Sequence, residues 1–172
     1  MQFLGISGSL RKGSHNYSLL EAIAACVEDG DQFTIFERAK HVPVFDEDIE
    51  ANGMPDAVAE LQDAVRRCDI VIFSTPEYNQ SLAGSTKNLL DWISRDPEGS
   101  PLIGKPCAVT GATVGSWGTR IAQSQLITVL YACGALVLPP RHFVAKAGVD
   151  TRECDTLTGF FDEVRQAARG IL

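Results

Sequence analysis

Short apolar runs alternate along this chain with segments in which apolar residues recur at helical spacing. Each run is bounded by glycine, proline, aspartate or serine, which is typical of strands buried on both faces of a sheet. The runs cover residues 2–7, 32–36, 69–75, 106–111 and 135–138. The helical stripes run from Leu19 to Val27, Pro55 to Val65, Leu89 to Ile93, Ala122 to Cys133 and Leu157 to Ala168. Five strands alternating with five helices predict an α/β fold, and right-handed crossovers favour a three-layer, doubly wound parallel sheet.

The chain shows no internal repeat, low-complexity tract or linker, and its 172 residues are close to the length of one domain. We therefore expect a single domain over residues 1–172. The longest irregular connection is predicted at 37–54, where Pro43, Asn52 and Gly53 are typical of a loop. Ligands of doubly wound sheets bind outside the carboxyl ends of the strands, so the loops after the first, third and fourth strands are the candidates for a site.

Composition argues against several classes of partner. With 15 Lys and Arg against 22 Asp and Glu, the formal charge is −7, which disfavours nucleic acid or an anionic membrane surface as the partner. No apolar stretch approaches the roughly 18 residues that cross a bilayer, and the N-terminus has no signal-like pattern, so a cytoplasmic protein is expected. The five cysteines form no C-x-x-C pair and the three histidines are scattered, which predicts reduced structural thiols and no metal site.

The loop after the first strand, residues 8–16, gathers glycines, hydroxyls and two cations just before a helix. Backbone N–H groups, the helix dipole and Arg11 predict an anion site, with phosphate as the expected ligand. The alternative is an ordinary turn in which Ser14 or Asn16 merely caps the helix. A Walker loop is excluded because Gly13 is followed directly by Ser14, and neither G-x-G-x-x-G nor G-x-S-x-G is complete. Such a loop suits a phosphate that is held and never transferred.

The loop after the third strand, residues 75–81, offers an aromatic side chain between proline and asparagine. At the carboxyl edge of a sheet, Tyr78 flanked by Pro76 and Asn79 is able to wall a flat ligand, while loop N–H and C=O groups meet its polar rim. Taken alone, the same residues also suit an ordinary turn.

The two loops together form a specific pattern. The first reads Gly8-Ser9-Leu10-Arg11-x-x-Ser14-x-Asn16, and the second reads Pro76-Glu77-Tyr78-Asn79-x-Ser81, followed by Gly84, Lys87-Asn88 and Asp91-Trp92. This combination resembles the NAD(P)H-dependent FMN reductase family, a group that includes bacterial quinone, chromate and azo-dye reductases. The resemblance runs from Phe3 to about Leu138 and implies a flavodoxin-like, five-stranded parallel sheet of strand order 2-1-3-4-5.

The resemblance also implies where FMN binds. Its phosphate would lie in the first loop, and its isoalloxazine would lie between the second loop and the loop after the fourth strand. The implied cofactor-binding residues are Ser9, Leu10, Arg11, Ser14, His15, Asn16, Pro76, Glu77, Tyr78, Asn79, Ala112, Thr113 and Gly115. The carboxylate of Glu77 is expected either near the acceptor or fully solvated.

The function implied by the resemblance is oxidation of NADPH or NADH and reduction of quinones or similar small acceptors by a ping-pong mechanism. Flavin N5 would carry the hydride, so no catalytic side chain is expected, and Tyr78 and Asn79 would position the ring. Two alternatives stay open: a flavodoxin-like electron carrier that serves a protein partner, and a regulatory protein that binds FMN without turnover. The family further implies a homodimer or homotetramer.

Some positions depart from the family pattern or leave an alternative open. Relatives usually have proline where this chain has Ala83, and Arg120 comes one place early in the family's G-x-A-R-x-Q pattern. A one-residue shift turns a helical side chain by about 100°, so no role in assembly is assigned to Arg120.

Two apolar features carry further expectations. Trp117 is expected to narrow the substrate pocket. The helix at 85–94 carries a wide apolar surface, which indicates either a subunit interface or a fully buried helix.

Overall fold

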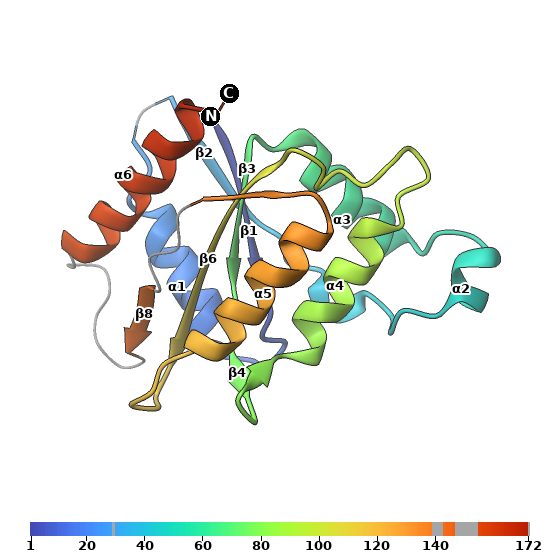
Figure 1. The fold of residues 1–172 in the computed structure, drawn as a ribbon, viewed down its shortest axis with the longest axis horizontal. Helices are drawn as coiled ribbons and strands as arrows, with labels where there is room; N and C mark the ends of the chain where they lie inside the picture. The colour runs from blue at the N-terminus through green and yellow to red at the C-terminus, as the bar shows by residue number, and fades with distance from the viewer. Residues whose placement is uncertain (29, 139–142, 147–154, 172) are drawn as a thin grey trace.

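A parallel sheet lies at the centre of the fold (Figure 1). The computed structural model describes residues 1–28, 30–138, 143–146 and 155–171. The strands lie in the order β2-β1-β3-β6-β7, and β8 also pairs with β6. This order confirms the predicted 2-1-3-4-5 arrangement, because β6 and β7 are the fourth and fifth sheet strands along the chain. The sheet strands are β1 Gln2–Ser7, β2 Gln32–Ile35, β3 Ile70–Ser74, β6 Pro106–Thr113, β7 Leu136–Val137 and β8 Phe143–Lys146.

Helices cover both faces of the sheet, which gives the predicted three layers. Because side chains alternate across a strand, each face has its own core. Leu4 and Phe73 pack with α3, α4 and α5 on one face, whereas Phe3 and Ile72 pack with α1 and α6 on the other. These helices are α1 His15–Ala24, α3 Asp56–Arg67, α4 Gly84–Ser94, α5 Arg120–Ala132 and α6 Asp155–Arg169.

The fifth strand position is shared by two short strands. β7 pairs with Pro106 and Cys107 at the start of β6, and β8 pairs with residues 110–113 at its end. The sequence predicts the first of these at 135–138 but predicts no strand at 143–146. The apolar run there is only Phe143 to Ala145, which is too short to show a period.

The connections contain more regular structure than the sequence predicts. The segment 37–54 includes the 3₁₀ helix η1 Ala39–His41 and the short helix α2 Glu47–Ala51, which projects from the body of the molecule (Figure 1). The loop after β3 folds into a hairpin of β4 Glu77–Tyr78 and β5 Ser81–Leu82. Pro55, expected inside its helix, is instead the residue before α3.

Helix α4 is buried within its own chain. Leu89, Leu90, Trp92 and Ile93 are each at most 1% exposed. They pack in the core formed by α3, α4 and α5, so the interface alternative for this apolar surface is wrong and the buried-helix alternative holds. Among the described residues, no helix is both long enough and apolar enough to span a bilayer.

Candidate functional site

The candidate site lies where β1, β3 and β6 end. In Figure 1 these strands point towards the same side of the molecule, and the β4–β5 hairpin lies on that side. The three loops named by the sequence therefore meet at one edge, as expected for the carboxyl ends of parallel strands. They comprise residues 8–14, residues 75–83 and residues 114–119.

The first loop exposes several hydrogen-bond donors to solvent. Across the part of the chain that the structure describes, the backbone N–H groups of residues 10–13 form no hydrogen bond to the protein. Arg11 and Lys12 are exposed, and neither has an ion-pair partner among the described residues. Gly13 has φ 65, a left-handed conformation that favours glycine and turns the chain into α1. Free N–H groups, a helix N-terminus and two unpaired cations fit a phosphate monoester such as that of FMN.

Contacts from the end of β3 and from the first turn of α4 hold the first loop in place. The Gly8 N–H donates to the Ser74 carbonyl at 2.8 Å, and the Ser85 hydroxyl donates to the Gly8 carbonyl. A Cβ on Gly8 would lie 1.9 Å from Thr86 Oγ1, so this approach requires glycine. The sequence did not indicate these roles for Ser74, Ser85 or Thr86, because their partners are distant in the chain.

Asn16 is a buried link between three elements at this edge. Its Oδ1 accepts from the Ser74 hydroxyl at 3.0 Å and from the Ala112 N–H at 2.9 Å, and its Nδ2 donates to the Ala112 carbonyl at 3.2 Å. The helix cap is Ser14, whose Oγ accepts from the Tyr17 N–H at 3.2 Å. Ser14 therefore caps α1, and Asn16 does not. A second Nδ2 hydrogen of Asn16 and the Ser14 hydroxyl hydrogen are available to a ligand.

Ser9, Leu10 and His15 complete the predicted first-loop set. The Ser9 N–H donates to Ser7 Oγ at 3.3 Å, while Leu10 is 47% exposed and His15 begins α1. The first loop itself borders a groove of about 390 Å³, whose lining includes Arg11, Tyr17 and Lys40. Burial, with Glu37 and Glu21 nearby, raises the pKa of Tyr17, so its hydroxyl stays protonated as a donor.

At the tip of its hairpin, the second loop makes a two-residue turn in which both residues have positive φ. Asn79 and Gln80 have φ 50 and φ 57, the left-handed values of a type I′ hairpin turn. Asparagine tolerates this conformation, whereas glutamine does so at a cost. Tyr78 is 55% exposed beside the turn, and Pro76 is buried beneath it. The turn thus presents an aromatic side chain and backbone groups at the edge of the sheet.

Glu77 is not fully solvated. Its Oε2 accepts from the N–H groups of Ile121 at 2.9 Å and Ala122 at 3.0 Å, at the start of α5. This corrects the expectation of a solvated carboxylate: a helix N-terminus favours an anionic acceptor, so the side chain turns towards α5.

The third loop begins later than predicted, because β6 continues to Thr113. Ala112 therefore lies inside a strand, and its N–H is taken by Asn16 rather than open to a ligand. Thr113 Oγ1 accepts from the Gly115 N–H at 3.1 Å, which shapes the start of the loop. A Cβ on Gly111 would lie 2.4 Å from the Thr75 carbonyl oxygen, so the second and third loops approach closely only with glycine there.

Exposed apolar side chains surround this edge of the sheet. Trp117 is 88% exposed and Val114 is 73% exposed, both in the third loop. Five exposed apolar side chains belong to the three loops or to the first turn of α5, and this set is called the apolar rim: Leu10, Tyr78, Val114, Trp117 and Ile121. An apolar rim beside an anion site suits a flat ligand that carries a phosphate. Within the described residues, no group of three His, Cys, Asp or Glu side chains is placed to hold a metal ion.

A doubly wound parallel sheet of this strand order, with its candidate site at the carboxyl ends of the strands, defines the class of flavodoxin-like proteins. The family model described as NADPH-dependent FMN reductase matches residues 1–150, and the chain belongs to this family.

Named relatives agree with this assignment. An NAD(P)H-dependent FMN reductase of Pseudomonas aeruginosa is 43% identical over 126 residues, which cover 73% of this chain and 67% of that protein. A quinone reductase of Escherichia coli is 32% identical over 160 residues, covering 92% of this chain and 84% of that protein. The solved structure of FerB, a flavoenzyme NAD(P)H:(acceptor) oxidoreductase from Paracoccus denitrificans, is similar with TM-score 0.89 at 27% identity, covering 98% of this chain and 97% of that chain. The chain is thus an enzyme of the NAD(P)H-dependent FMN reductase and quinone reductase type, with FMN as cofactor and NAD(P)H as co-substrate.

Proposed function

We propose that this enzyme oxidises NAD(P)H and reduces quinones or similar small acceptors by a ping-pong mechanism at the carboxyl edge of its sheet. The observation that supports this best is the joining of an unpartnered donor loop and an apolar rim at one edge. A phosphate and a flat ring are thereby accommodated side by side. When bound there, FMN supplies the hydride transfer between the nicotinamide and the acceptor.

Residues of the first loop would hold the phosphate. Arg11 would supply a charge-assisted hydrogen bond, and the N–H groups of residues 10–13 would add neutral ones. Ser9, Ser14 and Asn16 would contribute through the donors that their protein contacts leave free. The bonds of Gly8 to β3 and α4 and of Asn16 to β3 and β6 fix both ends of this loop, which limits its reorganisation on binding.

The second and third loops would position the ring. Tyr78 precedes the turn of Asn79 and Gln80, and Thr113 lies at the end of β6. Backbone N–H groups of these loops would stabilise negative charge on the ring as preorganised donors. Glu77 has its carboxylate occupied by two N–H groups, so we assign it no role as a proton donor or acceptor.

The decisive experiment is to add FMN, desalt, and then add NADPH or NADH without oxygen. Retained yellow colour that bleaches within seconds and returns with 1,4-benzoquinone supports the proposed function. Initial rates that give parallel double-reciprocal lines for NAD(P)H and benzoquinone support the ping-pong order. Retained flavin that neither nucleotide bleaches would instead favour an electron carrier, and no retained flavin would contradict the proposed function.

The proposal includes three finer properties of the enzyme. We place it in the cytoplasm, assign it chromate as a further acceptor, and expect a homodimer or homotetramer. The exposed apolar side chains of Val114 and Trp117 at the rim support burial against a second copy. Light scattering coupled to size-exclusion chromatography measures the mass directly, and a monomer of 18.6 kDa would contradict the oligomer.

A further inference from the structure

We infer that Glu77 and Gln125 are positioning residues that fasten the β4–β5 hairpin to α5 and thereby fix the turn that faces the flavin ring. The inference rests on the proposed function, because it takes the hairpin as a wall of the ring site. It adds a task for two side chains to which the proposed function assigns no contact with FMN.

Glu77 supplies a cap that α5 lacks in its own sequence. Thr119 precedes the helix, but it forms no side-chain cap bond within the described structure, and its Oγ1 accepts instead from Gln123 Nε2 at 2.9 Å. The carboxylate of Glu77 takes over by accepting from the N–H groups of Ile121 and Ala122, 44 and 45 residues further along the chain. A carboxylate at a helix N-terminus is stabilised by the exposed N–H groups and by the helix dipole.

Gln125 anchors the other strand of the hairpin. Its Oε1 accepts from the Leu82 N–H at 2.7 Å and from the Ser81 hydroxyl at 2.9 Å. Gln125 lies about one helical turn beyond the residues that Glu77 caps. The two strands of the hairpin are therefore both bound to the first two turns of α5.

The strand register shows what these two anchors do. Glu77 pairs with Leu82, and Tyr78 pairs with Ser81, so both anchors hold the base of the hairpin. The turn of Asn79 and Gln80 then projects beyond them. A two-stranded hairpin of this length is not stable by itself, and two non-glycine residues at positive φ destabilise it further. The anchors on α5 are thus the contacts that keep the turn in its observed conformation.

The same anchors join two walls of the site. Residues 114–119 lead directly into α5, and Glu77 binds the first turn of that helix. A displacement of the hairpin would therefore release the start of α5 and alter the third loop. The two N–H groups also hold the charged carboxylate of Glu77 against the start of α5.

The test compares Glu77→Ala and Gln125→Ala with two conservative variants, Glu77→Gln and Gln125→Glu, which keep an oxygen acceptor. Thr128→Ala is the matched control, because this exposed hydroxyl on α5 donates only to the Ser124 carbonyl of its own helix. The readouts are FMN affinity by fluorescence quenching, the absorbance spectrum of bound FMN, and kcat and KM for NADPH. Circular dichroism of each apoprotein checks the fold.

Both alanine variants are expected to weaken FMN binding by about tenfold and to shift the bound spectrum towards that of free FMN. The conservative variants should recover most of the loss, and Thr128→Ala should match the wild type. If Glu77→Ala does not fold, Gln125→Ala carries the test, because Gln125 is exposed and its loss leaves the core intact. Wild-type affinity and spectrum in the alanine variants would overturn the positioning role while leaving the proposed function standing. Failure of the wild type to bind FMN would instead overturn the proposed function.

Discussion

At the scale of single residues, substitution of Arg11 tests recognition of the FMN phosphate separately from recognition of the flavin ring. It is exposed in the donor loop and has no ion-pair partner in the described structure, so its removal breaks no protein contact. We expect Arg11→Ala to raise the dissociation constant of FMN by about ten- to a hundredfold, the cost of a charged hydrogen bond. Riboflavin, which lacks the phosphate, should bind both proteins equally. Fluorescence titration with the two flavins measures this difference, and an equal loss for riboflavin would contradict the assignment.

The buried cysteines make a second prediction at this scale. Burial raises the pKa of the Cys68 thiol to about 11, and it raises the pKa of Cys107 further. At pH 8 only about one Cys68 in a thousand is then a thiolate, and access is blocked as well. Native protein treated with iodoacetamide should therefore carry label on the partly exposed Cys26 before Cys68 or Cys107. Peptide mass spectrometry reads the order, and rapid native labelling of Cys107 would show that the core opens.

At the scale of elements, the sequence predicted whatever depends on local periodicity. β1 has the predicted bounds, and α4 begins one residue before the predicted start, because apolar runs and stripes follow directly from burial. The helix in segment 37–54 was missed since α2 has no buried residue and hence no apolar period. Its position is set instead by contacts with α4, which no local pattern encodes.

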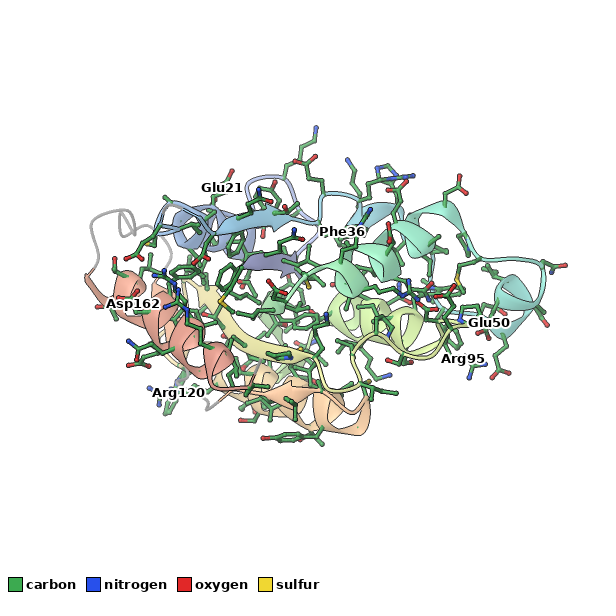
Figure 2. All side chains as sticks on the ribbon, turned by 90° about the horizontal axis from the view of Figure 1, so that it is seen from above. Glu21, Phe36, Glu50, Arg95, Arg120 and Asp162 are labelled. Carbon is green, nitrogen blue, oxygen red and sulfur yellow. The ribbon has the colours of Figure 1, made fainter. Side chains whose placement is uncertain are left out.

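Those contacts give a prediction for the projecting segment 43–54. Arg95 bonds both carboxylate oxygens of Glu50 at 2.8 and 2.9 Å and lies 5.7 Å from the Phe45 ring centroid; Figure 2 shows the ion pair at one end of the molecule. Asn88 accepts from the Phe45 N–H at 2.7 Å. Hydrogen bonding to Arg95 lowers the pKa of Glu50. The ion pair therefore stabilises the folded segment at pH values above the usual carboxylate pKa, and this stabilisation is lost as the pH falls through the lowered pKa.

We expect Arg95→Ala to speed hydrogen exchange across residues 46–54 at pH 7 and to leave β1 unchanged. Below the lowered pKa of Glu50 the difference between the variant and the wild type should shrink to the part that the Arg95–Phe45 contact contributes, because the carboxylate is protonated in both. Hydrogen-exchange mass spectrometry on matched samples measures this. Equal exchange at pH 7 would mean that Asn88 and the Trp92 indole, which donates to the Pro43 carbonyl at 2.9 Å, hold the segment without the ion pair.

At the scale of the whole molecule, the sequence predicted which loops meet at one edge of the sheet but did not predict how these loops are held. The apolar runs predict parallel strands, and the carboxyl ends of parallel strands lie at one edge of the sheet. The topology alone therefore predicts that the three loops after these strands lie at the same edge. The links between those loops join residues far apart: Asn16 with Ala112 are 96 positions apart, and Glu77 with Ile121 are 44 apart. Such pairings appear only once the sheet brings the loops together, so the sequence indicated Asn16 and Glu77 as ligands and missed their structural bonds.

Because the site is built from three loops of one sheet, ligand binding should stabilise the entire fold. FMN binds the folded chain and not the unfolded one, so at a free concentration of about 100 Kd it adds about 2.7 kcal/mol. For a chain of this length each kcal/mol raises Tm by about 2–4 °C, which gives an increase of about 5–10 °C. Differential scanning fluorimetry with FMN should show this increase, and riboflavin at the same concentration should give a smaller increase in Tm because it leaves the donor loop empty.

Hydrogen exchange in the presence of FMN should slow at residues 8–14, 75–82 and 113–119 and stay constant at 46–54, since α2 lies away from the three loops. Protection confined to the first loop would mean that the hairpin and third loop do not contact the ring.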